Sequence, residues 1–328
     1  MVVSVPAGVA PDHLPGPSRP RSWYLVAPSA ALRTGQALGV QVAGREVVVF
    51  RSETGRVHAL SAHCPHLGAH LKHGTVQGEL LRCPLHHWGF DGGGRCRAVP
   101  GRGDVSSLPG PRAWPVEERF GGVLVFNGPE ALFPPPDLGG GEHVWNVGPP
   151  VTVRCPWLPL AANSFDLEHL RTVHHRELWD TPTVEAPDPY TLRLRYTSRV
   201  TGTGVSDRLM KALSGNHIQV ALTLHGGTLM SVRSDLGRVQ GLLLASMTPV
   251  PEGTSVRLAV AARRGWLPGA AALALGVSRW LYTAFLRRDL SVLDGMRFNV
   301  ATATADPVMR QLLDFAVGLP EDPDDARR

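Results

Sequence analysis

Two short segments of the chain combine cysteine and histidine in a spacing that suits a metal centre. One residue separates Cys64 from His66, and two separate Cys83 from His86. Thiolate sulfur and imidazole nitrogen bind both iron–sulfur clusters and zinc. Zinc sites usually pair their cysteines as Cys-x-x-Cys, whereas each segment here supplies one ligand of each type. The pattern therefore favours an iron–sulfur cluster clamped by two loops that meet in space, with a zinc site as the alternative.

The sequences around these ligands, CPHLGA at 64–69 and CPLHHWGF at 83–90, resemble the two cluster boxes of Rieske proteins. The resemblance implies a [2Fe–2S] cluster with one iron bound by the two cysteines and the other by the two histidines. Neutral imidazoles should raise its reduction potential above that of an all-cysteine ferredoxin. Ala69 and Leu85 stand where respiratory Rieske proteins carry an extra disulfide, which favours the oxygenase and ferredoxin branch.

A second group of ligand-type side chains follows. His169 and His174 lie five residues apart, and Asp166 precedes the first by three. Two histidines and one carboxylate on one face of Fe(II) leave the other positions open for oxygen and substrate. Residues five apart on a regular helix point about 140° away from each other, so the helix must bend or end between the two histidines. Asp166, one turn earlier, is expected to accept a hydrogen bond through its carboxylate and orient the His169 imidazole.

The third iron ligand has no spacing signature of its own. The motif Asp-x-x-His-x-x-x-x-His at 166–174 resembles that of Rieske oxygenases, in which an aspartate after an apolar helix completes the site. Asp289 fits this pattern best, although an arginine precedes it. Asp294 and Asp180 are the alternatives, since acidic residues are common at exposed helix ends. The resemblance also implies that Asp166 links the mononuclear iron to the cluster of the next subunit in a homotrimer.

Length and composition indicate two domains. The chain has 328 residues, of which 43% are hydrophobic and 19% charged. That is ordinary for a globular protein, and a Rieske ferredoxin needs only about a hundred residues. A cluster of proline and glycine near residue 137 suits a linker. The expected organisation is a flexible N-terminal lead at 1–20, a Rieske domain at 21–133, a linker at 134–143 and a catalytic domain at 144–328.

Apolar alternation and β-branched residues predict strands in both domains. The expected strands are 40–51, 57–60, 80–83 and 122–126 in the first domain and 191–197, 219–224 and 255–260 in the second. The fold class is therefore α+β, an all-β Rieske domain followed by an antiparallel sheet flanked by helices. The apolar stretch 267–286 contains a proline, two glycines and Arg279, so we expect a buried amphipathic helix, with membrane-surface contact as the alternative.

Charge and cysteine content restrict the partners and the compartment. The net charge is +5, but the basic residues are scattered, which argues against nucleic acid and favours an acidic protein partner. Of the four cysteines, Cys96 and Cys155 remain as ordinary thiols. The proline-rich N-terminus does not resemble a signal peptide, and a cytoplasmic location is expected.

The resemblance implies a Rieske non-heme iron oxygenase, a monooxygenase or dioxygenase built from catalytic subunits alone. It would use O2 to hydroxylate, demethylate or desaturate a hydrophobic small molecule, aromatic or steroid-like. No dinucleotide fingerprint occurs, so electrons from NAD(P)H must arrive indirectly through a separate ferredoxin or flavin reductase. An electron-transfer or iron-sensing protein with a non-catalytic second domain is the alternative from another class.

Overall fold

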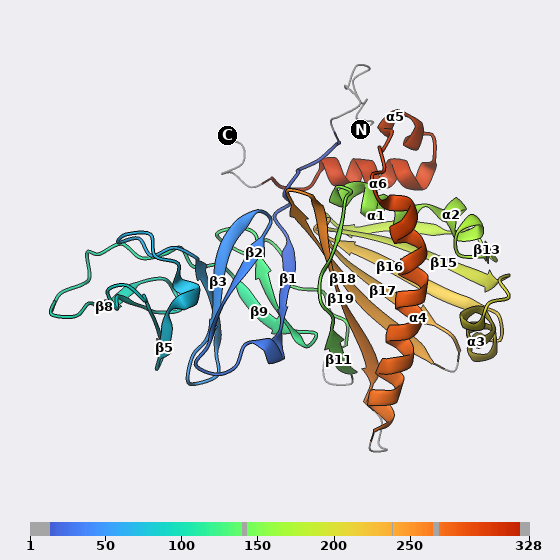
Figure 1. The fold of residues 1–328 in the computed structure, drawn as a ribbon. Helices are drawn as coiled ribbons and strands as arrows, with labels where there is room; N and C mark the ends of the chain where they lie inside the picture. Colours follow the sequence, from blue (N-terminus) through green and yellow to red (C-terminus); the bar gives the residue numbers. More distant parts are fainter. Residues whose placement is uncertain (1–13, 140–142, 238, 265–268, 322–328) are drawn as a thin grey trace.

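The structure, a computed structural model, describes residues 14–139, 143–237, 239–264 and 269–321 (Figure 1). It has two β-rich halves that lie side by side. The first half contains three small antiparallel sheets, and the second contains one nine-stranded sheet with helices. This arrangement confirms the predicted α+β class.

The first half is built almost entirely from short strands. Its strands are β1 (Trp23–Pro28), β2 (Ala37–Val42), β3 (Arg45–Arg51), β4 (Val57–Ser61), β5 (Thr75–Gln77), β6 (Leu80–Arg82), β7 (Gly89–Phe90), β8 (Cys96–Ala98), β9 (Val116–Arg119) and β10 (Gly122–Phe126). Two single turns of 3-10 helix, η1 (Ser29–Ala31) and η2 (Leu71–His73), accompany them. The sheets have the orders β1-β10-β9, β2-β3-β4 and β5-β6-β7-β8.

The predicted single strand at 40–51 is wrong, because a tight turn divides it into β2 and β3. Val42 pairs with Arg45, which leaves Ala43 and Gly44 as a two-residue hairpin loop. Both loop residues have positive φ, 48° and 80°. Such a loop matches the right-handed twist of the flanking strands, so the β-branched residues on either side pair with each other.

The second half combines long strands with six helices among the described residues. Its strands are β11 (His143–Val147), β12 (Val151–Val153), β13 (Arg176–Leu178), β14 (Thr183–Asp188), β15 (Thr191–Val200), β16 (Ile218–His225), β17 (Leu229–Asp235), β18 (Gln240–Val250) and β19 (Gly253–Arg263). Its helices are α1 (Trp157–Phe165), α2 (Leu167–Thr172), α3 (Val205–Ser214), α4 (Ala270–Leu293), α5 (Val300–Ala303) and α6 (Pro307–Val317). The main strand order is β11-β19-β18-β17-β16-β15-β13, with β12 on β19 and β14 on β15.

The middle of the large sheet is buried on both faces. Successive residues of a strand point to opposite faces, and neighbours on β17 show the result. Met230 packs in a core shared with α1 and α6, whereas Leu229 packs in a core shared with β1 and β10 of the first half. The two halves are therefore joined by an apolar layer as well as by the chain.

The described part of the predicted flexible lead, residues 14–20, is packed against the second half. The indole Nε1 of Trp157 donates to the Pro17 carbonyl at 3.0 Å. Gly16 has φ 83°, and a Cβ there would lie 2.3 Å from the Ala316 carbonyl oxygen of α6. The lead is therefore not free over these residues, and residues 1–13 lie outside the described part. The domain boundaries at 133 and 143 stay predictions.

Helix α4 differs from the expected buried amphipathic helix. Leu273, Val277 and Trp280 in its first half are 72%, 38% and 46% exposed. Apolar residues occur around the whole helix, and only one side can pack on the sheet. Over the described residues, no helix is both long and apolar enough to cross a membrane. Residues 267 and 268 of the predicted stretch lie outside the described part.

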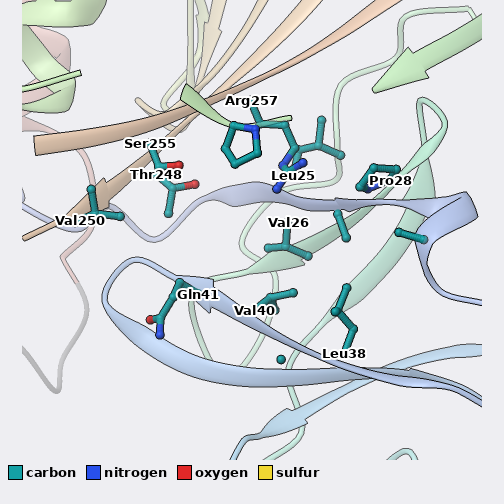
Figure 2. Close-up of a pocket in the computed structure, with 14 residues that line it drawn as sticks. Leu25, Val26, Pro28, Leu38, Val40, Gln41, Thr248, Val250, Ser255 and Arg257 are labelled. Carbon is teal, nitrogen blue, oxygen red and sulfur yellow. The ribbon is translucent and has the colours of Figure 1, made fainter. Parts of the chain in front are cut away.

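A groove of about 400 Å³ lies where β1 and β2 face β18 and β19 (Figure 2). Its walls are mainly aliphatic, and Arg257 on β19 donates to the Gly148 carbonyl at 3.0 Å beside it. The predicted metal ligands are not among the groove's lining residues. The groove is therefore a feature of the junction between the halves, separate from the metal centres described next.

Candidate metal centres

The first centre is formed by two loops with the same backbone pattern. In the loop after β4, Gly68 N donates to the Cys64 carbonyl and Cys64 N donates to the Ala69 carbonyl, both at 2.9 Å. In the loop after β6, His87 N donates to the Cys83 carbonyl at 3.0 Å and Cys83 N donates to the Trp88 carbonyl at 2.8 Å. The fourth residue after each cysteine has positive φ in both loops. Each loop thus presents its cysteine and histidine from an equivalent turn.

The four predicted cluster ligands lie together at the end of these loops. Both cysteine side chains are buried, with 2% exposure each, whereas His66 and His86 are exposed. The two imidazole centroids lie 4.8 Å apart, and Trp88 stacks on His66 at 4.5 Å. Two cysteine sulfurs and two histidine nitrogens are the donors that a cluster with one cysteine-bound and one histidine-bound iron takes.

The Cys64 thiol would not ionise readily on its own. Burial raises the pKa of Cys64 to about 11, with the neighbouring Cys83 sulfur adding to the effect. A thiolate is the metal-binding form, and a bound metal stabilises it. The residues present therefore fit a [2Fe–2S] cluster. The leucines next to the histidines, Leu67 and Leu85, are 66% and 53% exposed.

The second centre is held by α2, the turn before β13, and α4. Asp166 begins α2, where its carboxylate accepts from Glu168 N at 2.9 Å and His169 N at 3.4 Å. The helix ends at Thr172. This end confirms the prediction that a regular helix cannot continue between His169 and His174.

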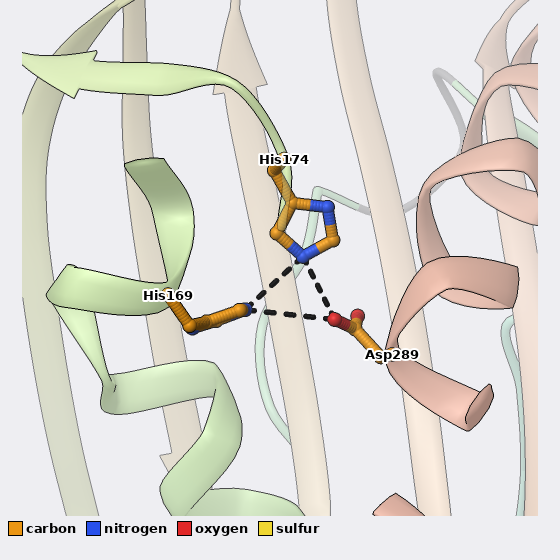
Figure 3. Close-up of side chains that lie close together, drawn as sticks. All are labelled: His169, His174 and Asp289. Carbon is orange, nitrogen blue, oxygen red and sulfur yellow. Dashed lines mark hydrogen bonds and ion pairs between the residues drawn. The ribbon is translucent and has the colours of Figure 1, made fainter. Parts of the chain in front are cut away.

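The three predicted iron ligands meet at this point (Figure 3). Nε2 of His174 lies 2.8 Å from Asp289 Oδ1 and 3.0 Å from His169 Nε2, and His169 Nε2 lies 3.5 Å from the same oxygen. Bonds of about 2.1 Å at right angles would place neighbouring ligand atoms about 3 Å apart. The side chains of His174, Asp289 and His169 are 0%, 8% and 11% exposed. Their separation and burial fit a two-histidine, one-carboxylate iron site.

The two imidazoles are oriented by different contacts. Nδ1 of His169 lies 2.6 Å from the backbone carbonyl of Asp166. The His174 ring stacks on Phe285 of α4 at 3.6 Å and 5°. The expectation that the Asp166 carboxylate orients His169 is therefore wrong in this structure, because that carboxylate caps α2 and the backbone carbonyl takes its place.

Protonation of the three groups is coupled. Burial opposes the charged form of His169, but hydrogen bonds to Asp289 and the Asp166 carbonyl outweigh it and raise its pKa. Burial lowers the pKa of His174, despite Asp289, and Arg288 contributes to the lowering. Burial favours neutral Asp289, yet the hydrogen bonds from both histidines hold its pKa below the usual value. A metal binds neutral imidazoles and an ionised carboxylate, so Fe(II) would compete with protons at this site.

The alternative carboxylates have other partners. Asp294 accepts from Arg154 Nε at 2.8 Å, and Asp180 accepts from Thr197 N at 2.7 Å. Within the described ranges, the group of potential metal ligands found contains Asp289 and neither of these. The choice of Asp289 is thus confirmed by geometry.

Two aromatic residues beside the centres were missed from the sequence. Phe285 lies four residues before Asp289 and therefore on the same face of α4. Trp88 lies two residues after His86 and reaches back to His66 in the other loop. Only the spacing of Phe285 from a ligand carried a usable signal, because the contact of Trp88 crosses between loops.

Comparisons with known proteins cover both halves. The Rieske [2Fe-2S] domain family matches residues 22–109. Aminopyrrolnitrin oxygenase PrnD from Pseudomonas fluorescens is 31% identical over 274 residues, which cover 72% of each chain. The oxygenase component of 3-ketosteroid-9-alpha-monooxygenase from Rhodococcus rhodochrous is 36% identical over 118 residues, or 36% of this chain. The match spans only 31% of that relative's length.

Solved structures agree on the fold. Dicamba monooxygenase bound to dicamba superposes with a TM-score of 0.67 at 21% identity, covering 95% of this chain and 100% of that one. The likeness in fold therefore covers nearly the whole of this chain. With a Rieske domain, a mononuclear iron site formed by His169, His174 and Asp289, and a relative aligned across both halves, this chain belongs to the Rieske non-heme iron oxygenases as a catalytic alpha subunit.

Proposed function

We propose that the protein is an oxygenase component that uses O2 and reducing equivalents to hydroxylate, demethylate or desaturate a hydrophobic small molecule. The observation that carries this proposal is the convergence of His169, His174 and Asp289 within 4.8 Å in a chain that also has a Rieske domain. The matched relatives are named for a ketosteroid and an aminopyrrolnitrin reaction. These names support an aromatic or steroid-like substrate.

The roles of the ligands follow from their surroundings. We assign Cys64, His66, Cys83 and His86 to the cluster, since they are the donors that the two equivalent loops bring together. When bound, the mononuclear iron would supply open coordination positions for oxygen and substrate. The protein contributes a fixed ligand geometry.

Residues around the mononuclear site hold that geometry and keep water out. The Asp166 carbonyl fixes which nitrogen of His169 faces the metal. Phe285 covers one face of the His174 ring, which is fully buried. These contacts leave Nε2 of both imidazoles directed at the Asp289 carboxylate.

A homotrimer is proposed because the two centres lie at opposite ends of the molecule. Figure 1 shows β5 and β8 of the cluster region at one end of the molecule and α2 and β13 at the other. Electron transfer within one subunit would have to cross the large sheet. A neighbouring subunit that brings its exposed His66 and His86 beside Asp166 would shorten the route, as the family resemblance implies.

A separate reductase and a cytoplasmic location are also part of the proposal. Exposed Leu67 and Leu85 frame the cluster histidines, and the net charge of +5 would attract an acidic ferredoxin or flavin reductase. NAD(P)H would act only through that partner. The described cysteines are all free, which is consistent with a reducing compartment. The two domains are proposed at 21–133 and 144–328, with the linker between them.

Metal content and turnover test the proposal together. Anaerobically purified protein should contain about three irons and two acid-labile sulfides per chain and give a Rieske EPR signal when reduced. Turnover of aromatic and steroid substrates should require an added reductase. A protein that has about two irons, takes up no more on Fe(II) addition and oxidises no substrate would instead be an electron carrier.

A further inference from the structure

Helix α3 is attached to the rest of the protein in an unusual way. A surface helix normally buries an apolar stripe, but the buried side chain in α3 is Asp207, which is 2% exposed. Its carboxylate Oδ2 accepts from Gly204 N at 3.2 Å, at the start of the helix. A buried carboxylate is costly unless it is paired, so its partners identify what the helix is fixed to.

Those partners are two arginines next to the mononuclear site. Nη2 of Arg176 lies 3.9 Å from Asp207 Oδ1, and Nη2 of Arg288 lies 3.9 Å from Oδ2. Arg176 follows His174 by two residues, and Arg288 immediately precedes Asp289. One carboxylate therefore connects the two chain segments that carry these ligands.

The backbone just before α3 is also hydrogen-bonded to the segment that carries His174. Thr201 N and Gly202 N donate to the carbonyl of His175, at 2.9 Å and 3.3 Å. A Cβ on Gly202 would lie only 2.3 Å from Asp207 Oδ2, so the chain passes directly beside the carboxylate. The segment from 201 to the first turn of α3 is thus fixed to the turn that holds His174.

Removing the negative charge would disturb both ligand segments. Arg176 is only 7% exposed, and its Nη1 has no hydrogen-bond partner within the described residues. Without Asp207, the buried Arg176 guanidinium would lose the carboxylate that it faces, and a buried charge that loses its counter-charge shifts or draws in water. Either response would displace the segment that carries His174, and the link through Asp207 to Arg288 and the adjoining Asp289 would be lost as well.

We propose that Asp207 is a positioning residue of the mononuclear site, which sets the spacing of the His174 and Asp289 segments and couples the order of α3 to metal binding. The proposal rests on metal binding at the three ligands described above. Coupling is reciprocal: metal should protect α3 from local opening, and loss of the α3 contact should weaken metal affinity.

The test compares wild-type protein with Asp207→Asn, which keeps the size of the side chain and removes its charge. Fe(II) affinity is measured anaerobically by competition with a fluorescent chelator, and hydrogen exchange is followed in a peptide over 203–214, with and without Fe(II). We expect about 10-fold weaker binding in the variant. Fe(II) should slow exchange in this peptide of the wild type and leave the variant unchanged.

Glu185→Gln is the matched control. Glu185 pairs with Arg193 at 3.8 Å on β14 and β15, and its replacement makes the same change of charge away from both ligand segments. The Fe(II) affinity of this variant should equal that of the wild type. The cluster absorbance of every variant should be unchanged, which shows that the first half is intact.

Two further measurements keep the outcome decisive. If Asp207→Asn does not fold, Asp207→Glu and Arg288→Lys retain both charges with altered geometry and should show intermediate affinity. Wild-type affinity in Asp207→Asn, or faster exchange in α3 with no change in affinity, would overturn the positioning role. A wild-type protein that binds no Fe(II) at His169, His174 and Asp289 would instead overturn the site itself.

Discussion

The two metal centres of this chain differ in depth and in how they are assembled. The cluster ligands come from two short loops, and the cluster histidines face solvent. The mononuclear ligands come from three elements, with His174 and Asp289 separated by 115 residues, and none has a side chain more than 11% exposed. The proposed function uses this difference: the exposed centre can exchange electrons with another protein, and the buried centre is shielded from water.

The difference also concerns what each centre depends on. Each cluster loop closes on its own backbone hydrogen bonds, so its geometry is local. The mononuclear site exists only when α2 and α4 are packed on the sheet to which β13 belongs. The cluster region should therefore tolerate changes in the second half, whereas the mononuclear site should respond to changes in any of its three elements.

The largest effect is expected from Cys83→Ser. This change removes a buried sulfur ligand and should abolish the cluster signal and electron-dependent turnover. Because the centres are assembled independently, Fe(II) affinity at the mononuclear site should stay within about 2-fold of wild type. EPR and Fe(II) titration of the same sample check both statements, and simultaneous loss of both metals would show that the centres are not independent.

Asp289→Ala removes a ligand of the mononuclear site and leaves the cluster ligands in place. Loss of the carboxylate should lower mononuclear Fe(II) affinity by more than about 100-fold and stop turnover, since the partners of a ligand alone are worth about 10- to 100-fold. The Rieske absorbance and EPR signal should be unaltered. Asp294→Ala, which removes the partner of Arg154 at the end of α4, is the control and should retain both iron and activity. Retained mononuclear iron in Asp289→Ala would reject Asp289 as a ligand.

A smaller effect on metal binding is expected from the two aromatic residues that stack on ligand histidines. Phe285→Leu removes the ring that holds buried His174 and should weaken Fe(II) binding by about 10-fold. Trp88→Leu removes the ring that stacks on exposed His66, where solvent also contacts the imidazole, and we expect cluster content close to that of wild type. Comparable losses in the two variants would contradict the contrast between a deep and a shallow site.

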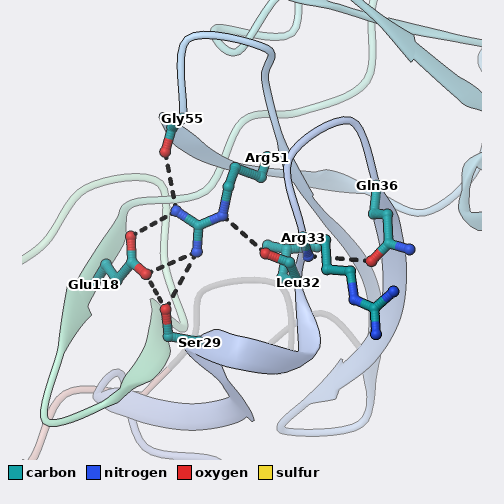
Figure 4. A network of polar contacts seen from close by, with 7 residues as sticks. All are labelled: Ser29, Leu32, Arg33, Gln36, Arg51, Gly55 and Glu118. Atoms are coloured by element: carbon teal, nitrogen blue, oxygen red, sulfur yellow. Dashed lines mark hydrogen bonds and ion pairs between the residues drawn. The ribbon is translucent and has the colours of Figure 1, made fainter.

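The smallest effect concerns the contact that joins two sheets of the first half (Figure 4). Arg51 on β3 donates to Glu118 on β9 at 2.7 and 2.9 Å and to the Leu32 carbonyl at 2.8 Å. The hydrogen bond from Arg51 lowers the pKa of Glu118, against the opposing effect of burial. The ion pair therefore stabilises the fold at pH values above the pKa that Glu118 has in the unfolded chain. This stabilisation is lost as the pH falls through the lower pKa that Glu118 has in the folded protein.

Glu118→Gln should therefore cost about 0.5 kcal/mol near pH 7, because the pair is partly exposed and screened. The cost should shrink as pH drops below about 4. Thermal unfolding of variant and wild type across this range measures it. Metal content of the second centre should not change, and a pH-independent difference would assign the effect to packing.

The cluster ligands and the His169 and His174 pair could be predicted from the sequence because each set is local, whereas the third mononuclear ligand was left to family resemblance. Two residues separate Cys83 from His86, whereas Asp289 could be chosen over Asp294 only by analogy. The role of the Asp166 backbone carbonyl had no signal, since side-chain type says nothing about a carbonyl. The turn at Ala43 was hidden because alanine is not a typical residue at positive φ.

The exposure of α4 could not be predicted for a different reason. Its composition is apolar enough for a buried helix, and the sequence does not show how much of the helix the sheet will cover. Leu273 and Trp280 thus differ from Leu293, which is 1% exposed at the other end of the same helix. Burial depends on neighbours that are distant in sequence.

The apolar layer between the halves has a consequence for protein engineering. Leu242 and Leu244 on β18 are covered by β1 and β10, so either half expressed alone would expose an apolar surface to water. Exchange of whole Rieske domains between homologous oxygenases should therefore give poorly soluble chimeras unless the residues on both sides of this layer are transplanted as one set.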